Sequence, residues 1–220
     1  MFYPEDEPVP VGLISQNMVL EPLSTRHLEL DYGAVMESKE LLRRWSLSDW
    51  PSDSFTIEEN AADLARHESE HFDRVAFTYT VLNPAATECL GCLYIKPLGE
   101  TVRAALSTAL WAEDAPVRTG LDSARPDNHV AHEDVHHAQS VEHIAWASFW
   151  VRQSRLAENL DRVLLEKLLY WFEEEFSFDK LLFSTAEKDD RQVSLFAEVG
   201  LKQLHRSEAP DNRGARLFFV

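Results

Sequence analysis

A cysteine pair and a histidine cluster are the residues whose types and spacing most readily suggest chemistry. Cys89 and Cys92 form a C-x-x-C pair. The histidines lie further along the chain, at His129, His132, His136, His137 and His143. Histidines three or four positions apart can bind a metal from one face of a helix, and thiolates with imidazoles make Cys2His2 zinc sites.

A structural role is favoured for both groups, and no metal site is predicted. Residues three apart in a strand point to opposite faces, so Cys89 and Cys92 would converge only if the chain turned at Gly91. A thioredoxin-like redox role is less favoured still, because the pair does not open a helix after a strand. The acidic, histidine-rich segment is interpreted as a solvated loop or a partner-contact surface.

Composition excludes several classes of function. The chain has 220 residues, with 45% hydrophobic and 27% charged residues, which is ordinary usage for a globular protein with one substantial core. Its 21 basic and 38 acidic residues give a formal charge of −17, which repels nucleic acid and anionic lipid. The 7 glycines are scattered, so neither a dinucleotide-binding fingerprint nor a P-loop is present.

The ends and the cysteine content predict a cytoplasmic location. The first residues, MFYPEDEPVP, are acidic and proline-rich, unlike a secretory signal, which has basic residues before an apolar run. No apolar run is long enough to span a membrane. With 2 cysteines the chain has no disulfide framework, which suits a reducing compartment.

Apolar periodicity predicts a mixed α/β order of elements within a single domain, 1–220. The predicted elements are a strand at 17–23, helices at 27–45 and 57–72, strands at 76–82, 89–97 and 143–151, a helix from 160 to about 172, a strand at 180–186, a helix at 190–199, and strands at 201–206 and 216–220. Thr56 and Glu59 have the spacing of a capping box. Residues 99–142 form a long excursion that is functional, disordered, or carries a short element such as 102–111.

This order resembles the GCN5-related N-acetyltransferase (GNAT) family. The resemblance is carried mostly by residues 148–172 and 179–201, the latter closing on Gly200 and Leu201, and by the hairpin 77–97 with Gly91 at the usual place. It implies a mixed-sheet α/β acyl-CoA N-acyltransferase fold. It also implies that acetyl-CoA is a substrate, with its pyrophosphate at a helix N-terminus that follows a central strand.

The loop before that helix departs from the family signature, which is Arg or Gln, two residues, Gly, one residue, then Gly or Ala. Aligned on the apolar pair 164–165, these positions hold Leu156, Asn159 and Asp161. Asparagine can adopt the left-handed conformation of glycine. A carboxylate at 161 would repel a pyrophosphate if it pointed into the cleft. A second register, with Arg152, Arg155 and Ala157, starts the helix too early for its apolar stripe.

By the resemblance, a set of residues around this loop would bind acetyl-CoA. They are Trp150, Val151, Arg152, Arg155, Ala157, Glu158, Asn159, Leu160, Arg162 and Asp189. The arginines among them would offset local acidity, because a guanidinium binds phosphate in a bidentate manner. Asp189 stands where the family has an asparagine, and Phe196 stands where it often has a proton-donating tyrosine.

The implied reaction is attack of a neutral amine on the acetyl thioester, which needs an oxyanion donor and a proton acceptor. The expected oxyanion donor is a backbone N–H near Trp150 and Val151. The candidate bases are Glu88, Glu142 and His143.

An acceptor pocket is expected between the first two helices and the sheet, by the same resemblance. Its candidate lining residues are Trp45, Trp50, Phe72 and Phe77.

Two functions follow from these observations. The first is an N-acetyltransferase that moves an acetyl group from acetyl-CoA to a primary amine of a small molecule or peptide. The alternative is a catalytically inactive GNAT-fold protein that binds a ligand or a protein partner. A homodimer is compatible with either function.

Overall fold

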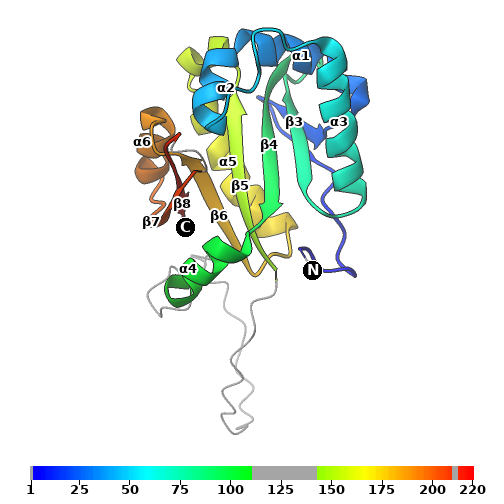
Figure 1. Ribbon diagram of the computed structural model, residues 1–220. Coiled ribbons are helices and arrows are strands. Elements are labelled where there is room, and N and C mark those ends of the chain that lie inside the picture. The colour runs from blue at the N-terminus through cyan, green and yellow to red at the C-terminus, as the bar shows by residue number, and fades with distance from the viewer. Residues whose placement is uncertain (1, 111–142, 210–212) are drawn as a thin grey trace, which may run out of the picture.

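The computed structural model describes residues 2–110, 143–209 and 213–220. Their strands form one eight-stranded sheet in the order β1-β2-β3-β4-β5-β6-β8-β7 (Figure 1). The strands are β1 (Leu13–Ile14), β2 (Val19–Pro22), β3 (Phe77–Leu82), β4 (Cys89–Pro97), β5 (Ile144–Val151), β6 (Lys180–Ala186), β7 (Gln203–Glu208) and β8 (Ala215–Phe219). Neighbouring strands are antiparallel except β5 and β6, which are parallel. The predicted mixed α/β fold is confirmed.

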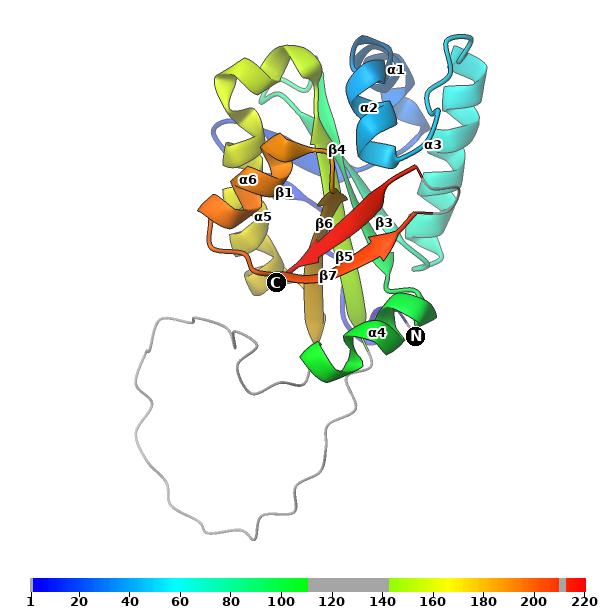
Figure 2. The same ribbon diagram turned by 60° about the vertical axis from the view of Figure 1, so that its left-hand side comes forward.

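Helices cover both faces of the sheet (Figure 2). They are α1 (Leu28–Glu37), α2 (Lys39–Ser46), α3 (Ile57–Phe72), α4 (Glu100–Leu110), α5 (Leu160–Glu175) and α6 (Asp190–Glu198), with short 3-10 helices η1 (Thr25–His27) and η2 (Gln153–Glu158). α5 and α6 lie on one face, and α1, α2 and α3 lie on the other. No described helix is both long and apolar enough to cross a membrane.

Each face buries its own apolar cluster. Leu164, Leu168 and Phe172 of α5 pack with Phe149 of β5, which explains the helical apolar stripe of this segment. On the opposite face, Trp45 of α2 belongs to a second cluster beneath α1 and α2. The sheet is therefore covered where its two central parallel strands lie.

Several predicted elements differ in detail: the strand predicted at 201–206 is β7 (Gln203–Glu208), and β1 was not predicted. The helix predicted at 27–45 is two helices, α1 and α2, because the chain breaks at Ser38, whose hydroxyl accepts a hydrogen bond from the backbone N–H of Gln153 (3.0 Å). The element predicted at 102–111 is α4, and the excursion from residue 111 to 142 lies outside the described residues. The capping box of α3 is confirmed, with Thr56 Oγ1 accepting from Glu59 N (3.2 Å).

A β-bulge in β4 brings the two cysteines to one face. Cys89 is opposite Leu82 while Gly91 is opposite Val81, so one extra residue is inserted at this point of β4. Gly91 has φ +155°, and a Cβ there would lie 2.0 Å from the backbone oxygen of Trp150. The expectation that the cysteines point to opposite faces was wrong, because the bulge changes the alternation.

Candidate functional site

The parallel strands β5 and β6 separate partway along their length. Their pairing runs from Ile144 with Lys180 to Ala147 with Phe183 and then ends. Beyond that point β5 stays paired with β4, and β6 stays paired with β8. Ser148 and Ser184 are therefore the first residues of a split in the middle of the sheet.

Backbone N–H groups of β5 face this split. Arg152 N donates to Leu90 O of β4 (2.8 Å), so alternation turns the N–H of Trp150 toward β4 as well. The N–H groups of Phe149 and Val151 are directed to the other side, toward the split. Of the two expected oxyanion donors, Trp150 and Val151, only the N–H of Val151 faces the split. The N–H of Phe149 faces it as well.

The segment after β5 turns sharply at Asn159. η2 occupies residues 153–158, Asn159 has φ 54° and ψ 32°, and α5 begins at Leu160. The left-handed conformation of Asn159 and the start of α5 agree with the register that places Leu156, Asn159 and Asp161 at the signature positions. Ala157, Glu158 and Asn159 are exposed at the N-terminal end of α5, where free N–H groups and the helix dipole favour an anion.

Carboxylates of the protein already engage the arginines of this segment. The pairs are Arg152 with Glu37 (2.5 Å) and Glu88 (3.6 Å), Arg155 with Glu88 (2.5 Å) and Glu158 (2.8 Å), and Arg162 with Glu166 (3.7 Å) and Glu198. Glu37 also accepts from the backbone N–H of Ser154 (3.2 Å). A phosphate that binds these arginines must therefore compete with the protein's own carboxylates.

Asp161 does not point freely into the cleft. Its side chain is buried and forms a bidentate pair with Arg191 of α6, at 2.5 and 2.8 Å. The same guanidinium donates to Leu156 O (2.8 Å) and to Asn159 Oδ1 (3.3 Å). Arg191 thus neutralises the carboxylate that the sequence placed at a phosphate-binding position, and it ties the loop to α6.

A glutamine side chain bridges the split itself. Gln192 Nε2 donates to Phe149 O of β5 (2.8 Å), and Gln192 Oε1 accepts from Thr185 Oγ1 of β6 (2.6 Å). Asp189 caps the same helix by accepting from Gln192 N (3.1 Å), and burial raises its pKa. The start of α6 therefore holds the two separated strands at a fixed spacing.

The Glu37 contact predicts a pH dependence. The hydrogen bond from Arg152 lowers the pKa of Glu37 to about 2, whereas an unfolded glutamate has a pKa of about 4.3. Its contribution to stability is complete above the unfolded pKa and is lost as the pH falls through the folded pKa. We expect Glu37→Gln to lower the melting temperature at pH 7, with a difference from wild type that shrinks between pH 4 and 2. Glu173→Gln, at an exposed site on α5, is the control, and a difference independent of pH would contradict this assignment.

A pocket of about 300 Å³ opens on the α1–α3 face. It is lined by Trp45 and Trp50, by His67 of α3, by Tyr94 of β4 and by Ser148 of β5, among others. Tyr94 is directly opposite Ser148 in the β4–β5 pairing, so the pocket lies beside the start of the split. Burial raises the pKa of Tyr94 well above its ordinary value, and burial, reinforced by Arg66, lowers the pKa of His67 to about 4.

Only part of the predicted acceptor pocket is correct. Trp45 and Trp50 line it, but Phe72 is 86% exposed and Phe77 is buried in the core on the α5 face. Sequence reasoning missed His67 and Tyr94. An available signal for His67 was its helical spacing from the buried residue Leu64.

The two candidate bases that the structure describes, Glu88 and His143, do not line this pocket. His143 precedes β5, at the end of the strand away from the split, and its backbone N–H donates to Asp179 (2.9 Å). Glu88 is bound to Arg155. Glu142 lies outside the described residues, as do His129, His132, His136 and His137.

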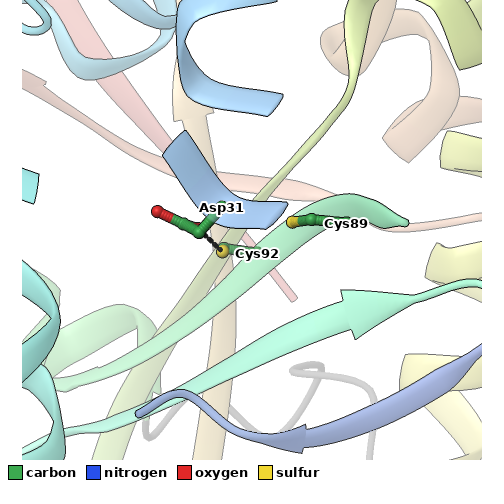
Figure 3. A group of neighbouring side chains, drawn as sticks. All are labelled: Asp31, Cys89 and Cys92. Atoms are coloured by element: carbon green, nitrogen blue, oxygen red, sulfur yellow. Dashed lines mark hydrogen bonds between the residues drawn. The ribbon is translucent and has the colours of Figure 1, made fainter. Parts of the chain in front are cut away.

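Asp31, Cys89 and Cys92 form a buried cluster between α1 and β4 (Figure 3). Their ligand atoms lie within 4.8 Å of one another, and the Cys92 thiol donates to Asp31 Oδ1 (3.4 Å). Asn60 donates to Asp31 Oδ2 (2.9 Å). Burial raises the pKa of Asp31, and the Cys89 contact together with burial raises that of Cys92. We interpret the cluster as a hydrogen-bonded group in which burial disfavours the ionised form of both acids.

This interpretation predicts that Asp31→Asn stabilises the protein. A carboxyl with a raised folded pKa destabilises the native state progressively as the pH rises above its unfolded pKa of about 3.9. Asparagine has a similar shape and no proton to lose, so the melting temperature should rise at pH 8 and change little at pH 4. Thermal unfolding across this range is the measurement. A lower melting temperature at pH 8 would show that the ionised carboxylate is needed there.

Comparisons with known proteins match this chain to solved structures of similar fold. No family model and no curated protein matches the sequence. Solved structures that match include the ribosomal L7/L12 α-N-protein acetyltransferase RimL in complex with coenzyme A, with TM-score 0.62, 11% identity, and 96% of this chain and 95% of that chain covered. The ribosomal-protein-S5-alanine acetyltransferase from Vibrio fischeri matches with TM-score 0.63, 10% identity, and coverage of 96% and 95%.

A third match is the microcin C7 self-immunity acetyltransferase MccE in complex with acetyl-CoA and AMP, with TM-score 0.64, 9% identity, and 96% of each chain covered. All three matches cover 96% of this chain. The chain has the fold of the GNAT acyl-CoA N-acyltransferases, as the sequence analysis expected.

Proposed function

We propose that this protein is an N-acetyltransferase that moves an acetyl group from acetyl-CoA to a primary amine. One observation carries the proposal: the split at Ser148 and Ser184 lies between a helix N-terminus suited to an anion and a pocket suited to a small acceptor. The GNAT fold and the cofactors named for the matched structures support the same assignment. The residues proposed to bind acetyl-CoA are Trp150, Val151, Arg152, Arg155, Ala157, Glu158, Asn159, Leu160, Arg162 and Asp189.

The chemistry would take place at the split. The nitrogen of a neutral amine in the pocket attacks the carbonyl carbon of the thioester. A carbon–nitrogen bond forms, and the carbon–sulfur bond to coenzyme A breaks. The N–H groups of Phe149 and Val151 are placed to donate hydrogen bonds to the developing oxyanion. The nitrogen loses one proton and the departing thiolate gains one, so the products are an amide and free coenzyme A.

Tyr94 is the candidate proton donor to the thiolate. Phe196, at the family's tyrosine position, is fully buried in the α5-face core and has no proton to give. The Tyr94 hydroxyl accepts from Trp150 Nε1 (3.3 Å), and its raised pKa keeps it protonated. Tyr94 is opposite Ser148, and both residues line the acceptor pocket beside the split.

A thiol-release assay tests the proposal. The purified protein is incubated with acetyl-CoA and a panel of primary amines, and free coenzyme A is measured. We expect amine-dependent release, with kcat at least about tenfold lower for Tyr94→Phe. The matched control is Tyr32→Phe, whose hydroxyl donates to Phe55 O. Binding of acetyl-CoA without release for any amine would favour the inactive binding protein.

The remaining features of the proposal are a single domain, 1–220, and a cytoplasmic location. Both described cysteines are free thiols, which supports a reducing compartment. An amine acceptor, rather than nucleic acid or membrane, agrees with the acidic charge of the chain. Dimerisation stays a prediction.

A further inference from the structure

The acceptor pocket contains two basic side chains with no carboxylate partner. Lys96 of β4 and Arg216 of β8 are half-buried and line the cavity. Neither forms an ion pair within the part of the chain that the structure describes. Other basic side chains do have carboxylate partners, as exposed Arg206 has in Glu187 (2.7 Å).

Arg216 is held rigidly by neutral groups. Its Nη1 donates to Ser184 Oγ (3.2 Å) and its Nη2 donates to Trp45 O (3.0 Å). The guanidinium carbon lies 5.9 Å from the Trp45 ring centroid and 5.4 Å from that of Trp146. Ser184 is the first residue of β6 in the split, so this guanidinium is fixed beside the reaction centre.

The positive charge of Arg216 is not balanced locally. Burial lowers the pKa of Arg216 to about 10, which still leaves it charged at neutral pH. Burial also lowers the pKa of Lys96; among the nearby charges Glu70 opposes this shift, while Arg66 and Arg216 reinforce it. A buried charge without a counterion is costly. Such an arrangement is stabilised when an anion binds.

The other polar groups of the pocket do not supply that counterion. Its carboxylate, Asp63, lies 3.4 Å from Arg66, which also pairs with Glu70 (2.9 Å). Trp45 and Trp50 carry buried indole N–H groups with no hydrogen-bond partner among the described residues. Donors and positive charge are therefore in excess, although the whole chain carries −17.

We propose that the acceptor carries a compact anionic group, a carboxylate or a phosphate, which binds Lys96 and Arg216 in this pocket. That this ligand is the acetyl acceptor rests on the proposed acetyltransferase function, whereas anion binding in the pocket does not depend on that function. An anion at Arg216 would anchor the molecule beside Ser184 and leave its amine free to reach the split. The substrate class is thus an amino acid or an amino phosphate rather than a simple alkylamine.

Binding is tested first, without acetyl-CoA. Quenching of tryptophan fluorescence is titrated with two matched pairs, 4-(aminomethyl)benzoate against benzylamine and O-phosphoethanolamine against ethanolamine. We expect the anionic member of at least one pair to bind at least about tenfold more tightly than its neutral partner. The pair that shows this difference in affinity tells whether the pocket binds a carboxylate or a phosphate. Equal affinity within both pairs would overturn the proposal.

Variants assign the site. Arg216→Gln and Lys96→Met should each weaken anion binding about tenfold, while Lys202→Gln, an exposed lysine at the start of the β7–β8 hairpin, should not. Lys96→Met gives the result independently if Arg216→Gln fails to fold. Unchanged anion affinity in a folded Arg216→Gln or Lys96→Met protein would overturn the assignment.

Thiol release from acetyl-CoA then separates the two proposals. We expect kcat/KM to be at least about tenfold higher for the anionic amine, and we expect Arg216→Gln to remove this preference. Charge-dependent binding with no thiol release would retain the anion site and refute the acetyltransferase function. Release that is equally fast with neutral amines would retain the function and refute the anionic acceptor.

Discussion

Gly91→Ala should lower the melting temperature by about 10 °C, a large stability effect for one added methyl group. The added Cβ would lie 2.0 Å from Trp150 O, at a backbone φ of +155° that L residues rarely adopt. Strain of this kind and overpacking each cost about 1–3 kcal/mol, and 1 kcal/mol corresponds to about 2–4 °C in a protein of this size.

Gly33→Ala is the matched control. Gly33 lies in α1, and a Cβ there meets nothing within 4 Å. The variant should be more stable than wild type by about 0.5–1 kcal/mol, because alanine is favoured over glycine inside a helix. A Gly91→Ala protein that unfolds within about 2 °C of wild type would show that the bulge in β4 does not hold the strands at the described separation.

Gln192→Ala should destabilise the free protein and tighten acetyl-CoA binding. Losing the side chain leaves Phe149 O and Thr185 Oγ1 without their partner, at a cost of about 1–3 kcal/mol for a buried unsatisfied group. We expect a cosubstrate that enters the split to compete with Gln192 for Phe149 O. Removing that competition is worth about one hydrogen bond, or roughly a tenfold gain in affinity.

Thermal unfolding and calorimetric titration measure the two effects separately. Gln203→Ala, at an exposed position of β7, is the control and should change neither quantity. A destabilised variant with weaker acetyl-CoA binding would mean that Gln192 supports the cosubstrate. Unchanged affinity would mean that the cosubstrate does not enter between β5 and β6.

Elements whose burial is set by local periodicity were predictable from the sequence. α3 begins and ends where its apolar spacing and capping box indicate, and β4 has the predicted bounds. The break at Ser38 was not predictable from local spacing; Ser38 contacts Gln153, far away in the chain, through a hydrogen bond to its hydroxyl. The bulge at Gly91 likewise depends on how β4 meets its neighbours.

The candidate site was predictable only in part, for the same reason. The left-handed conformation of Asn159 follows from the residue type and the start of the apolar stripe. The partner of Asp161 is Arg191, which only the packing of α5 against α6 brings close. Lys96 and Arg216 come from β4 and β8, so their shared pocket depends on the sheet order. The sequence gives one signal for Arg216, because it is a basic residue inside an otherwise apolar strand.

Thermal unfolding with increasing acetyl-CoA tests most directly whether this GNAT fold binds acetyl-CoA at the α5 N-terminus. Acetyl-CoA at a hundred times its dissociation constant should stabilise the protein by about 2.7 kcal/mol, or about 5–10 °C. Asn159→Trp and Ala157→Glu, which place bulk or negative charge on the exposed loop, should reduce this rise strongly, while Glu173→Gln on α5 should not. No rise at millimolar acetyl-CoA, or an equal rise in both folded loop variants, would contradict the proposed cosubstrate site.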